Sequence, residues 1–190
     1  MLAQLKENNR PLYLTLVCGG GTLLDNGCHL LDLSRLFVGN FVSGKGMTSN
    51  SYWKNIEVED TAALQLKWRN GALGTMAVTM LTYPKNLEGS ITILGENGTV
   101  RVGGVAVNDI QTWEFADQKD YDAEVRAANY ETTSVYGFGH PLYYRNVIDV
   151  LRGNAEPETD GREGLKSLEF LTAAYIAARD HTTVGLPLHI

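Results

Sequence analysis

The chain has 190 residues, 44% hydrophobic and 20% charged, with a formal net charge of −6 at pH 7. This length and composition are typical of a single globular domain, here residues 1–190. The acidic excess argues against nucleic acid, which is bound by surfaces rich in lysine and arginine. No apolar run is long enough to span a bilayer and the first residues lack a signal-peptide layout, so we expect a cytoplasmic protein with no membrane partner.

The first elements predicted along the chain are a strand and a helix. Residues 2–9 have the pattern of a helix end or a leader, and an apolar run at 12–17 predicts a strand. The glycine triplet 19–21 then turns the chain into a helix that we expect to end at Gly39. Thr22 is suited to cap this helix, and Asp25 lies three residues later, as in a capping box.

The middle of the chain predicts hairpins and the last third predicts helices. Residues 40–57 are rich in glycine, serine and asparagine and predict a loop, within which a short strand is left open. We expect paired strands on either side of Asn70-Gly71 and again at 90–94 and 99–102, because Asn-Gly between strand-like runs is a strong hairpin signal. The remaining predictions are a strand within 105–115, a linker or short helix at 117–131, helices at 141–152 and from about 160 to 180, and a short strand or tail at 184–188. This order predicts an α+β fold, an open, mainly antiparallel β-sheet with helices packed on one face.

One helix face gathers the best candidates for chemistry. Asp25, His29 and Asp32 are spaced four and three apart, so they lie above one another on the helix that follows the glycines. A histidine can take and return a proton near neutral pH, and an aspartate one turn away can orient it. The structural alternatives are open as well: Asp25 as a capping carboxylate and His29 as a buried, hydrogen-bonded imidazole.

Two other kinds of site are disfavoured. Gly19-Gly20-Gly21 lacks the third glycine of a dinucleotide-binding fingerprint, and hairpins follow where a second βα unit would be needed. We therefore expect no dinucleotide-binding unit in this chain. A metal site is also disfavoured, because one histidine without patterned cysteines is a poor zinc ligand set.

A second cluster lies at residues 138–144, Phe-Gly-His-Pro-Leu-Tyr-Tyr. One interpretation is a helix start, with His140 near the cap and Pro141 in the first turn. The other is that His140, with Tyr143 or Tyr144, lines a substrate pocket. The sequence leaves both open.

Taken together, these residues resemble the C-terminal half of the Gfo/Idh/MocA family of NAD(P)-dependent sugar oxidoreductases. Residues 19–32 are similar to the family's helix signature, G-G-G-x-L-x-D-x-G-x-H-x-x-D. Gly139-His-Pro-Leu-Tyr-Tyr, Asp160-Gly-Arg-Glu and the Ala-rich run before Arg179 add to the resemblance, which covers most of the chain. The tail is most similar to members that act on nucleotide-sugar or glucosamine-uronate substrates.

The resemblance implies a role for each matched residue. His29 would act as acid/base on the sugar hydroxyl and Asp25 would support it, while Asp32, His140, Tyr143 and Tyr144 would contact the substrate. NAD or NADP would be held by an N-terminal Rossmann domain that also supplies a lysine from a Glu-Lys-Pro motif. This chain contains neither, so the resemblance implies that it binds no cofactor alone and is inactive alone.

The resemblance thus implies a substrate-binding and catalytic acid/base domain that forms homo-oligomers through its sheet. The alternative is a non-enzymatic module of the same fold that binds sugars or only builds an oligomer.

Overall fold

The computed structural model describes residues 21–134 and 136–189. The predicted strand at 12–17 and the helix end or leader at 2–9 lie outside the described residues. The chain divides into two compact units. The first unit comprises the described residues up to Thr82 together with those from Gly161 onward, and the second unit comprises Tyr83–Asp160.

The first unit is built on a four-stranded antiparallel sheet. Its strand order is β3 (Leu73–Thr79), β2 (Thr61–Trp68), β1 (Phe41–Ser49) and β7 (Val184–Gly185). The predicted hairpin is confirmed, with Gly71 in the turn at a φ of +94°. Glycine suits this turn because residues with a side chain rarely adopt a positive φ.

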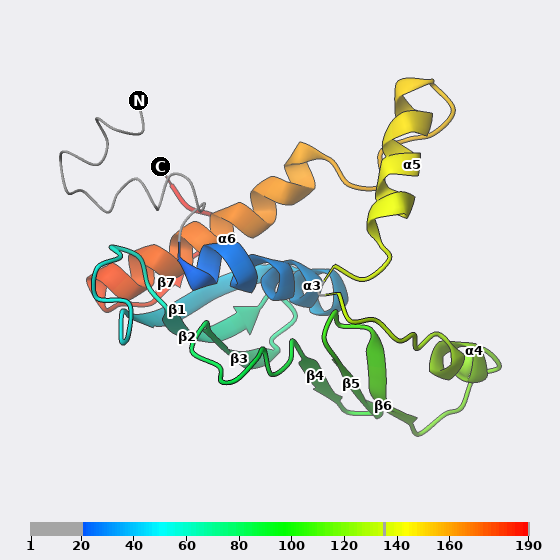
Figure 1. Ribbon diagram of the computed structural model, residues 1–190, viewed down its shortest axis with the longest axis horizontal. Helices are drawn as coiled ribbons and strands as arrows, with labels where there is room; N and C mark the ends of the chain where they lie inside the picture. The colour runs from blue at the N-terminus through cyan, green and yellow to red at the C-terminus, as the bar shows by residue number, and fades with distance from the viewer. Residues whose placement is uncertain (1–20, 135, 190) are drawn as a thin grey trace. The chain divides into compact units, whose positions relative to one another are not determined.

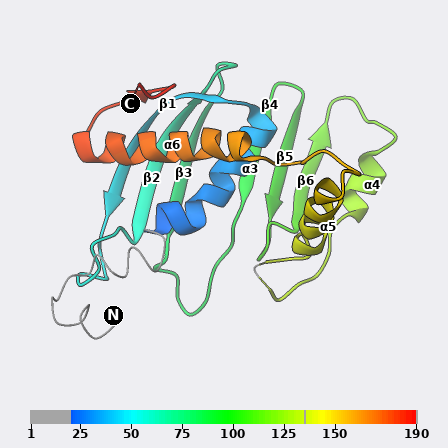
Figure 2. The same ribbon diagram turned by 90° about the horizontal axis from the view of Figure 1, so that it is seen from above.

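Helices cover one face of this sheet. A π-helical turn, η1 (Leu23–Gly27), continues directly into α3 (Cys28–Val38), and α6 (Gly161–Asp180) lies beside them over the strands (Figures 1 and 2). Gly39 ends α3 as predicted, with a φ of +113° and its N–H donating to the Arg35 carbonyl oxygen at 2.9 Å. Among the described residues, no helix is long and apolar enough to cross a membrane.

The core lies between the sheet and the helices. Alternate residues of β2 point inward, and all four are buried: Ala62, Leu64, Leu66 and Trp68. The Phe41 ring stacks on Phe170 of α6 with centroids 3.9 Å apart and contacts Trp68 at 5.1 Å. Leu23 of η1 and Leu31 of α3 belong to the same core and form the buried side of this helix. Because side chains alternate along β2, its four buried residues all point to the face that the helices cover.

The sequence prediction understated β1: residues 40–57 were expected to form a loop with at most a short strand, whereas Phe41–Ser49 form a nine-residue strand inside the sheet. Its glycines account for the error, because glycine is depleted in strands. Here they allow α6 to approach the backbone closely. A Cβ on Gly44 would lie 3.0 Å from the Phe170 ring, and one on Gly46 would lie 3.0 Å from the Ala174 carbonyl oxygen.

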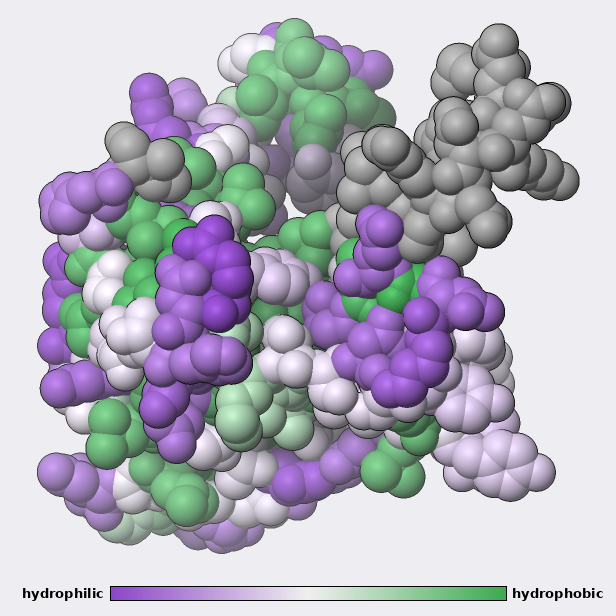
Figure 3. Space-filling model, turned by 90° about the vertical axis from the view of Figure 1, so that its left-hand side faces the viewer, coloured by the Kyte–Doolittle hydropathy of each residue, from purple (hydrophilic) through white to green (hydrophobic). Residues whose placement is uncertain are grey.

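None of the described helices of the first unit lies over the opposite face of the sheet. Its outward positions include Met47, Ala63 and Ala77, which are paired across the three strands in one row, and Leu73 at the edge. Met47 is 67% exposed and Leu73 is 77% exposed. Where α6 ends, by contrast, the surface of the first unit mixes hydrophilic and hydrophobic residues (Figure 3).

The second unit contains a three-stranded antiparallel sheet and two helices. The strands are β4 (Ile91–Gly95), β5 (Gly98–Gly103) and β6 (Asp109–Phe115), and the helices are α4 (Asp122–Ala127) and α5 (His140–Leu151). Asp122 joins α4 to β6, because its carboxylate accepts a hydrogen bond from the Trp113 indole at 2.9 Å.

The predicted α+β class with antiparallel sheets is confirmed. One difference concerns continuity: a single open sheet was expected, whereas the described strands are hydrogen-bonded in two groups. The residues between β3 and β4 form no strand, and no ladder joins these two strands.

Candidate functional site

The candidate site begins with the helix that carries Asp25, His29 and Asp32. Asp25 lies in the π-helical turn, and His29 is the second residue of α3. All three side chains are exposed, and Leu36, four residues beyond Asp32, is 70% exposed. The helix therefore buries one side and presents a polar face to solvent. π-helical turns of this kind occur frequently at functional sites.

The predicted cap of this helix was wrong. Thr22 has helical backbone angles and its side chain makes no capping hydrogen bond. Its hydroxyl is buried without a hydrogen-bond partner among the described residues. A capping residue normally has extended angles, so its hydroxyl can reach back to the free N–H groups of the first turn. Thr22 instead lies inside the helix, and the side chain that caps the first turn comes from elsewhere.

That side chain is Glu59, which immediately precedes the buried Asp60 and strand β2. Its Oε1 atom accepts a hydrogen bond from the Leu23 N–H at 2.9 Å, and its backbone carbonyl accepts one from the Thr22 N–H at 3.1 Å. A carboxylate at a helix N-terminus satisfies an otherwise unpaired N–H and interacts favourably with the helix dipole. Sequence reasoning missed Glu59. The signal available was a pair of acidic residues directly before an alternating strand.

Tyr175 of α6 contacts the same carboxylate. Its hydroxyl donates to Glu59 Oε1 at 2.8 Å. Burial, followed by the hydrogen bond to Glu59, raises the pKa of the Tyr175 phenol well above its usual value. The phenol therefore stays protonated and keeps donating across the pH range in which proteins are folded.

Asp32 has structural partners. Its Oδ1 accepts hydrogen bonds from the Ser167 hydroxyl of α6 at 2.5 Å and from Arg35 at 3.3 Å. Arg35 in turn pairs with Glu163 at 3.0 Å and donates to Ser167 at 3.1 Å. These contacts join α3 to α6. The substrate contact predicted for Asp32 stays a prediction, and any such contact shares the carboxylate with Ser167 and Arg35.

The first turn of this helix does not fit a dinucleotide. In dinucleotide-binding folds the cofactor's pyrophosphate lies at the N-terminus of the helix after the glycines. Here the Glu59 carboxylate occupies that position, and a second negative charge there would be repelled. The strands of the described sheets are antiparallel, whereas the dinucleotide fold needs parallel ones. In the described residues the N-terminus of this helix therefore already holds a carboxylate of the chain itself.

The second predicted cluster lies in the second unit, at the start of α5. The helix begins at His140 with Pro141 in its first turn, and its N-cap residue is Gly139, which has no side chain to cap the helix. His140 lies near Tyr144, with ring centroids 6.5 Å apart, and Tyr143 contacts Tyr144 at 5.6 Å. All three residues are exposed. The structural interpretation of the helix start is confirmed, and the substrate contact is a prediction.

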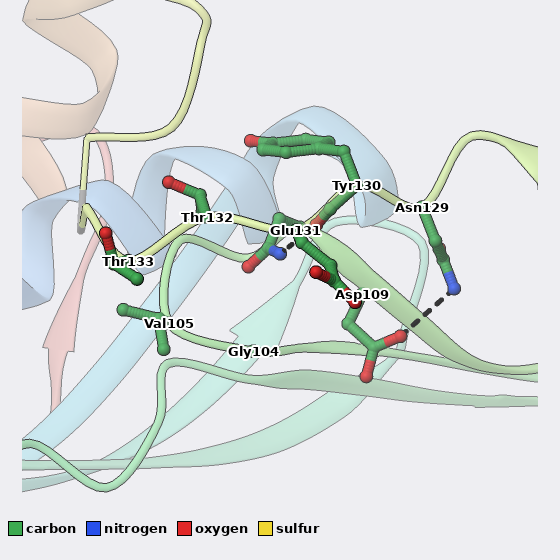
Figure 4. Close-up of a pocket in the computed structure, with 9 residues that line it drawn as sticks. Gly104, Val105, Asp109, Asn129, Tyr130, Glu131, Thr132 and Thr133 are labelled. Atoms are coloured by element: carbon green, nitrogen blue, oxygen red, sulfur yellow. Dashed lines mark hydrogen bonds between the residues drawn. The ribbon is translucent and has the colours of Figure 1, made fainter.

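A concave region of the second unit holds none of the predicted residues. This pocket of about 930 Å³ is shown in Figure 4. It is lined by Gly104, Val105, Asn108, Asp109, Asn129, Tyr130, Glu131, Thr132 and Thr133. The side-chain amide of Asn129 donates a hydrogen bond to Asp109 at 3.0 Å and accepts one from the Ile110 N–H at 2.8 Å. These two hydrogen bonds hold the segment of Asn129 against the start of β6.

A carboxylate also organises the loop after β1. The buried Asp60 accepts hydrogen bonds from the backbone N–H groups of Ser51, Tyr52 and Trp53 at 3.1, 2.7 and 3.2 Å. Burial alone would raise the pKa of Asp60, but these hydrogen bonds outweigh it and lower the pKa to about 2. The exposed Tyr52 and Trp53 rings are thereby held on a fixed turn, edge to face at 4.9 Å.

Comparison with protein families gives a match over most of the chain. The model described as the C-terminal alpha/beta domain of the oxidoreductase family, of the Gfo/Idh/MocA type, matches residues 17–186. A curated relative, the D-apiose dehydrogenase of Paraburkholderia graminis, is 25% identical over 184 residues, which cover 85% of this chain and 44% of the relative.

Two solved structures are much more similar. The WlbA dehydrogenase from Bordetella pertussis, in complex with NADH and UDP-GlcNAcA, is 59% identical with a TM-score of 0.84, over 90% of this chain and 49% of that one. The WlbA dehydrogenase from Chromobacterium violaceum, with the same two molecules, is 57% identical with a TM-score of 0.81, over 90% and 47%. This chain thus spans about half the length of these relatives.

Proposed function

Because this chain belongs to the C-terminal domain family of the Gfo/Idh/MocA oxidoreductases, we propose that it is the substrate-binding domain of a nicotinamide-dependent nucleotide-sugar dehydrogenase. The observation that carries the proposal is the exposed Asp25–His29 face, in a chain 59% identical to a dehydrogenase solved with NADH and UDP-GlcNAcA. Substrate, cofactor and activity belong to the whole protein, of which this chain matches about half.

The chemistry assigned to this chain is proton transfer. Oxidation of a secondary alcohol to a ketone removes a hydride from carbon and a proton from oxygen. The nicotinamide, held by a separate dinucleotide-binding domain, supplies the hydride acceptor. His29 takes the hydroxyl proton, and Asp25, one turn before it on the same helix, supports it in that role. Solvent exposure of His29 in this chain allows a substrate to reach it.

The other predicted substrate contacts are proposed for each unit by itself. Asp32 lies one turn beyond His29, and His140, Tyr143 and Tyr144 supply hydroxyls and an imidazole that suit sugar hydroxyl groups. The Glu59 carboxylate at the N-terminus of this helix supports the expectation that the cofactor's pyrophosphate is held by a separate domain. We therefore expect the 190-residue chain alone to show no dehydrogenase activity.

The uncovered sheet face supports an oligomer. Met47, Ala63 and Ala77 form a short apolar row across three strands, on a sheet face that none of the described helices covers. Exposed apolar patches can mark protein–protein contacts. In a two-fold symmetric dimer, the same face of each copy packs against the other. We propose that the chain pairs with itself there.

Titration of the 190-residue chain with UDP-GlcNAcA tests the proposal. Imidazole signals followed by NMR should show His29 shifting on addition of the nucleotide sugar. In Asp25→Asn the response should weaken. A chain that binds sugars nowhere near His29, as the non-enzymatic alternative requires, would leave the His29 signals unmoved while other signals shift. Absence of any binding would contradict the substrate assignment.

A further inference from the structure

We propose that Glu59 is the positioning residue of the Asp25–His29 face: its side-chain oxygen fixes where the helix begins and so how His29 is presented. The inference rests on the proposed function, because it assigns the support for that site. Glu59 binds the N–H groups of Thr22 and Leu23, and it acts on His29 through the helix backbone that runs from Leu23 to His29.

Two hydrogen bonds converge on one atom of Glu59. Oε1 accepts from the Leu23 N–H at 2.9 Å and from the Tyr175 hydroxyl at 2.8 Å. The backbone of the same residue accepts from the Thr22 N–H at 3.1 Å. Two successive N–H groups of the first turn are therefore held by one residue. Because Tyr175 belongs to α6, the carboxylate ties the helix start to that helix as well.

The space around the carboxylate explains the last glycine of the triplet. A Cβ built on Gly21 would lie 2.0 Å from Glu59 Oε2 and 2.1 Å from its carboxyl carbon. Contacts this short do not occur, so any other residue at position 21 would expel the carboxylate from the helix start. Gly21 is thus required by the Glu59 side chain, and its φ is not in the left-handed region. Gly21 and Glu59 therefore act together to fix the start of the helix.

His29 is exposed and is the second residue of α3. How its side chain is presented therefore depends on the helix backbone that carries it. That backbone begins six residues earlier at the Glu59 contact and passes through the π-helical turn, a less regular geometry than an α-helical start. Release of the first turn would let the π-turn repack and rotate His29.

Three variants of the 190-residue chain test the inference. Glu59→Ala removes the acceptor, whereas Glu59→Gln keeps a side-chain oxygen that can accept from Leu23 and Tyr175. Glu57→Ala removes an exposed carboxylate two residues away and serves as the matched control. Each is measured by amide hydrogen exchange at Leu23, by the His29 imidazole signals and by calorimetric titration with UDP-GlcNAcA.

In Glu59→Ala we expect Leu23 to exchange about tenfold faster, the His29 signals to move and the affinity for UDP-GlcNAcA to fall about tenfold. Glu59→Gln should restore all three to within about threefold of the parent chain, and Glu57→Ala should change none. If Glu59→Ala fails to fold, Tyr175→Phe, which removes only the phenol donor, should show the same changes to a smaller extent.

Two results would overturn the inference. One is faster exchange at Leu23 in Glu59→Ala with unmoved His29 signals and unchanged affinity, since Glu59 would then only stabilise the helix. The other is a Glu59→Gln variant as impaired as Glu59→Ala. If the parent chain binds no UDP-GlcNAcA, the proposed function fails, and the exchange and imidazole signals still decide whether Glu59 positions His29.

Discussion

Arg35 and Glu163 form an ion pair of 3.0 Å that joins α3 to the first turn of α6. The Arg35 side chain is only 12% exposed and also bonds to Ser167 and Asp32. It therefore links the candidate site helix to α6, the other helix that covers the sheet of the first unit. Removal of a largely buried arginine leaves its partners without a donor, and this costs more than the loss of an exposed pair.

Replacement of Arg35 with methionine should destabilise the first unit. The methionine keeps much of the apolar volume but leaves Asp32, Ser167 and Glu163 without their shared donor. We expect the free energy of unfolding, measured by urea titration, to fall by about 2 kcal/mol. Lys166→Met, which removes the exposed partner of the same Glu163, should cause a much smaller loss. Equal losses for the two variants would contradict the role of Arg35.

A methyl group on the backbone of β1 should also destabilise the unit. In Gly46→Ala the new Cβ would lie 3.0 Å from the Ala174 carbonyl oxygen, which is backbone and cannot move aside easily. Overpacking of this kind should lower the free energy of unfolding by about 1–3 kcal/mol. Gly164→Ala in α6 is the matched control, because nothing lies within 4 Å of its Cβ. It should stabilise the chain by about 0.5–1 kcal/mol.

The pH dependence of the free energy of unfolding should reveal the contribution of the Asp60 carboxylate. Its folded-state pKa of about 2 lies below the ordinary value of 3.8, so its contribution to stability is fully present above 3.8 and is lost as the pH falls toward 2. Asp60→Asn should therefore be less stable than the parent chain at neutral pH, and the two stabilities should converge near pH 2. Urea unfolding at several pH values measures this, with Glu57→Gln as control. A constant difference across the pH range would exclude Asp60 as the source.

The oligomer proposal predicts that the uncovered sheet face holds two copies together. Met47→Glu places a charge at the exposed end of the apolar row Met47, Ala63 and Ala77 and should convert an oligomer into a smaller species in light scattering. Leu94→Glu, at a position 79% exposed in the second unit, should leave the mass unchanged. A parent chain that is monomeric at all concentrations would contradict the proposal, as would an oligomer unaffected by Met47→Glu.

Most of the fold could be predicted from local patterns. The hairpin at Asn70-Gly71, the strands at 91–95 and 98–103 and the helix end at Gly39 are confirmed, since turn residues and alternation act within a few positions. Strand β1 could not be found this way. Its Gly44 and Gly46 are explained only by Phe170 and Ala174, more than a hundred residues later.

The family resemblance, drawn from the helix signature and the tail, is confirmed by the match over residues 17–186. The candidate site could be predicted only in part. The spacing of Asp25, His29 and Asp32 correctly indicated one helix face. The Thr22 cap was wrong, because the first turn is held by Glu59 across a separation of 36 residues, which no local pattern encodes.

The most direct test of the central claim is the turnover of a chimaeric enzyme. This chain would replace the C-terminal half of the 59% identical Bordetella pertussis WlbA dehydrogenase, and NADH formation from UDP-GlcNAcA would be measured. We predict that the chimaera is active and that His29→Ala lowers kcat by about 10²–10⁴-fold, as loss of a general base does. His189→Ala, at an exposed position near the chain end, should leave kcat unchanged. An active chimaera whose kcat is unaffected by His29→Ala would contradict the account.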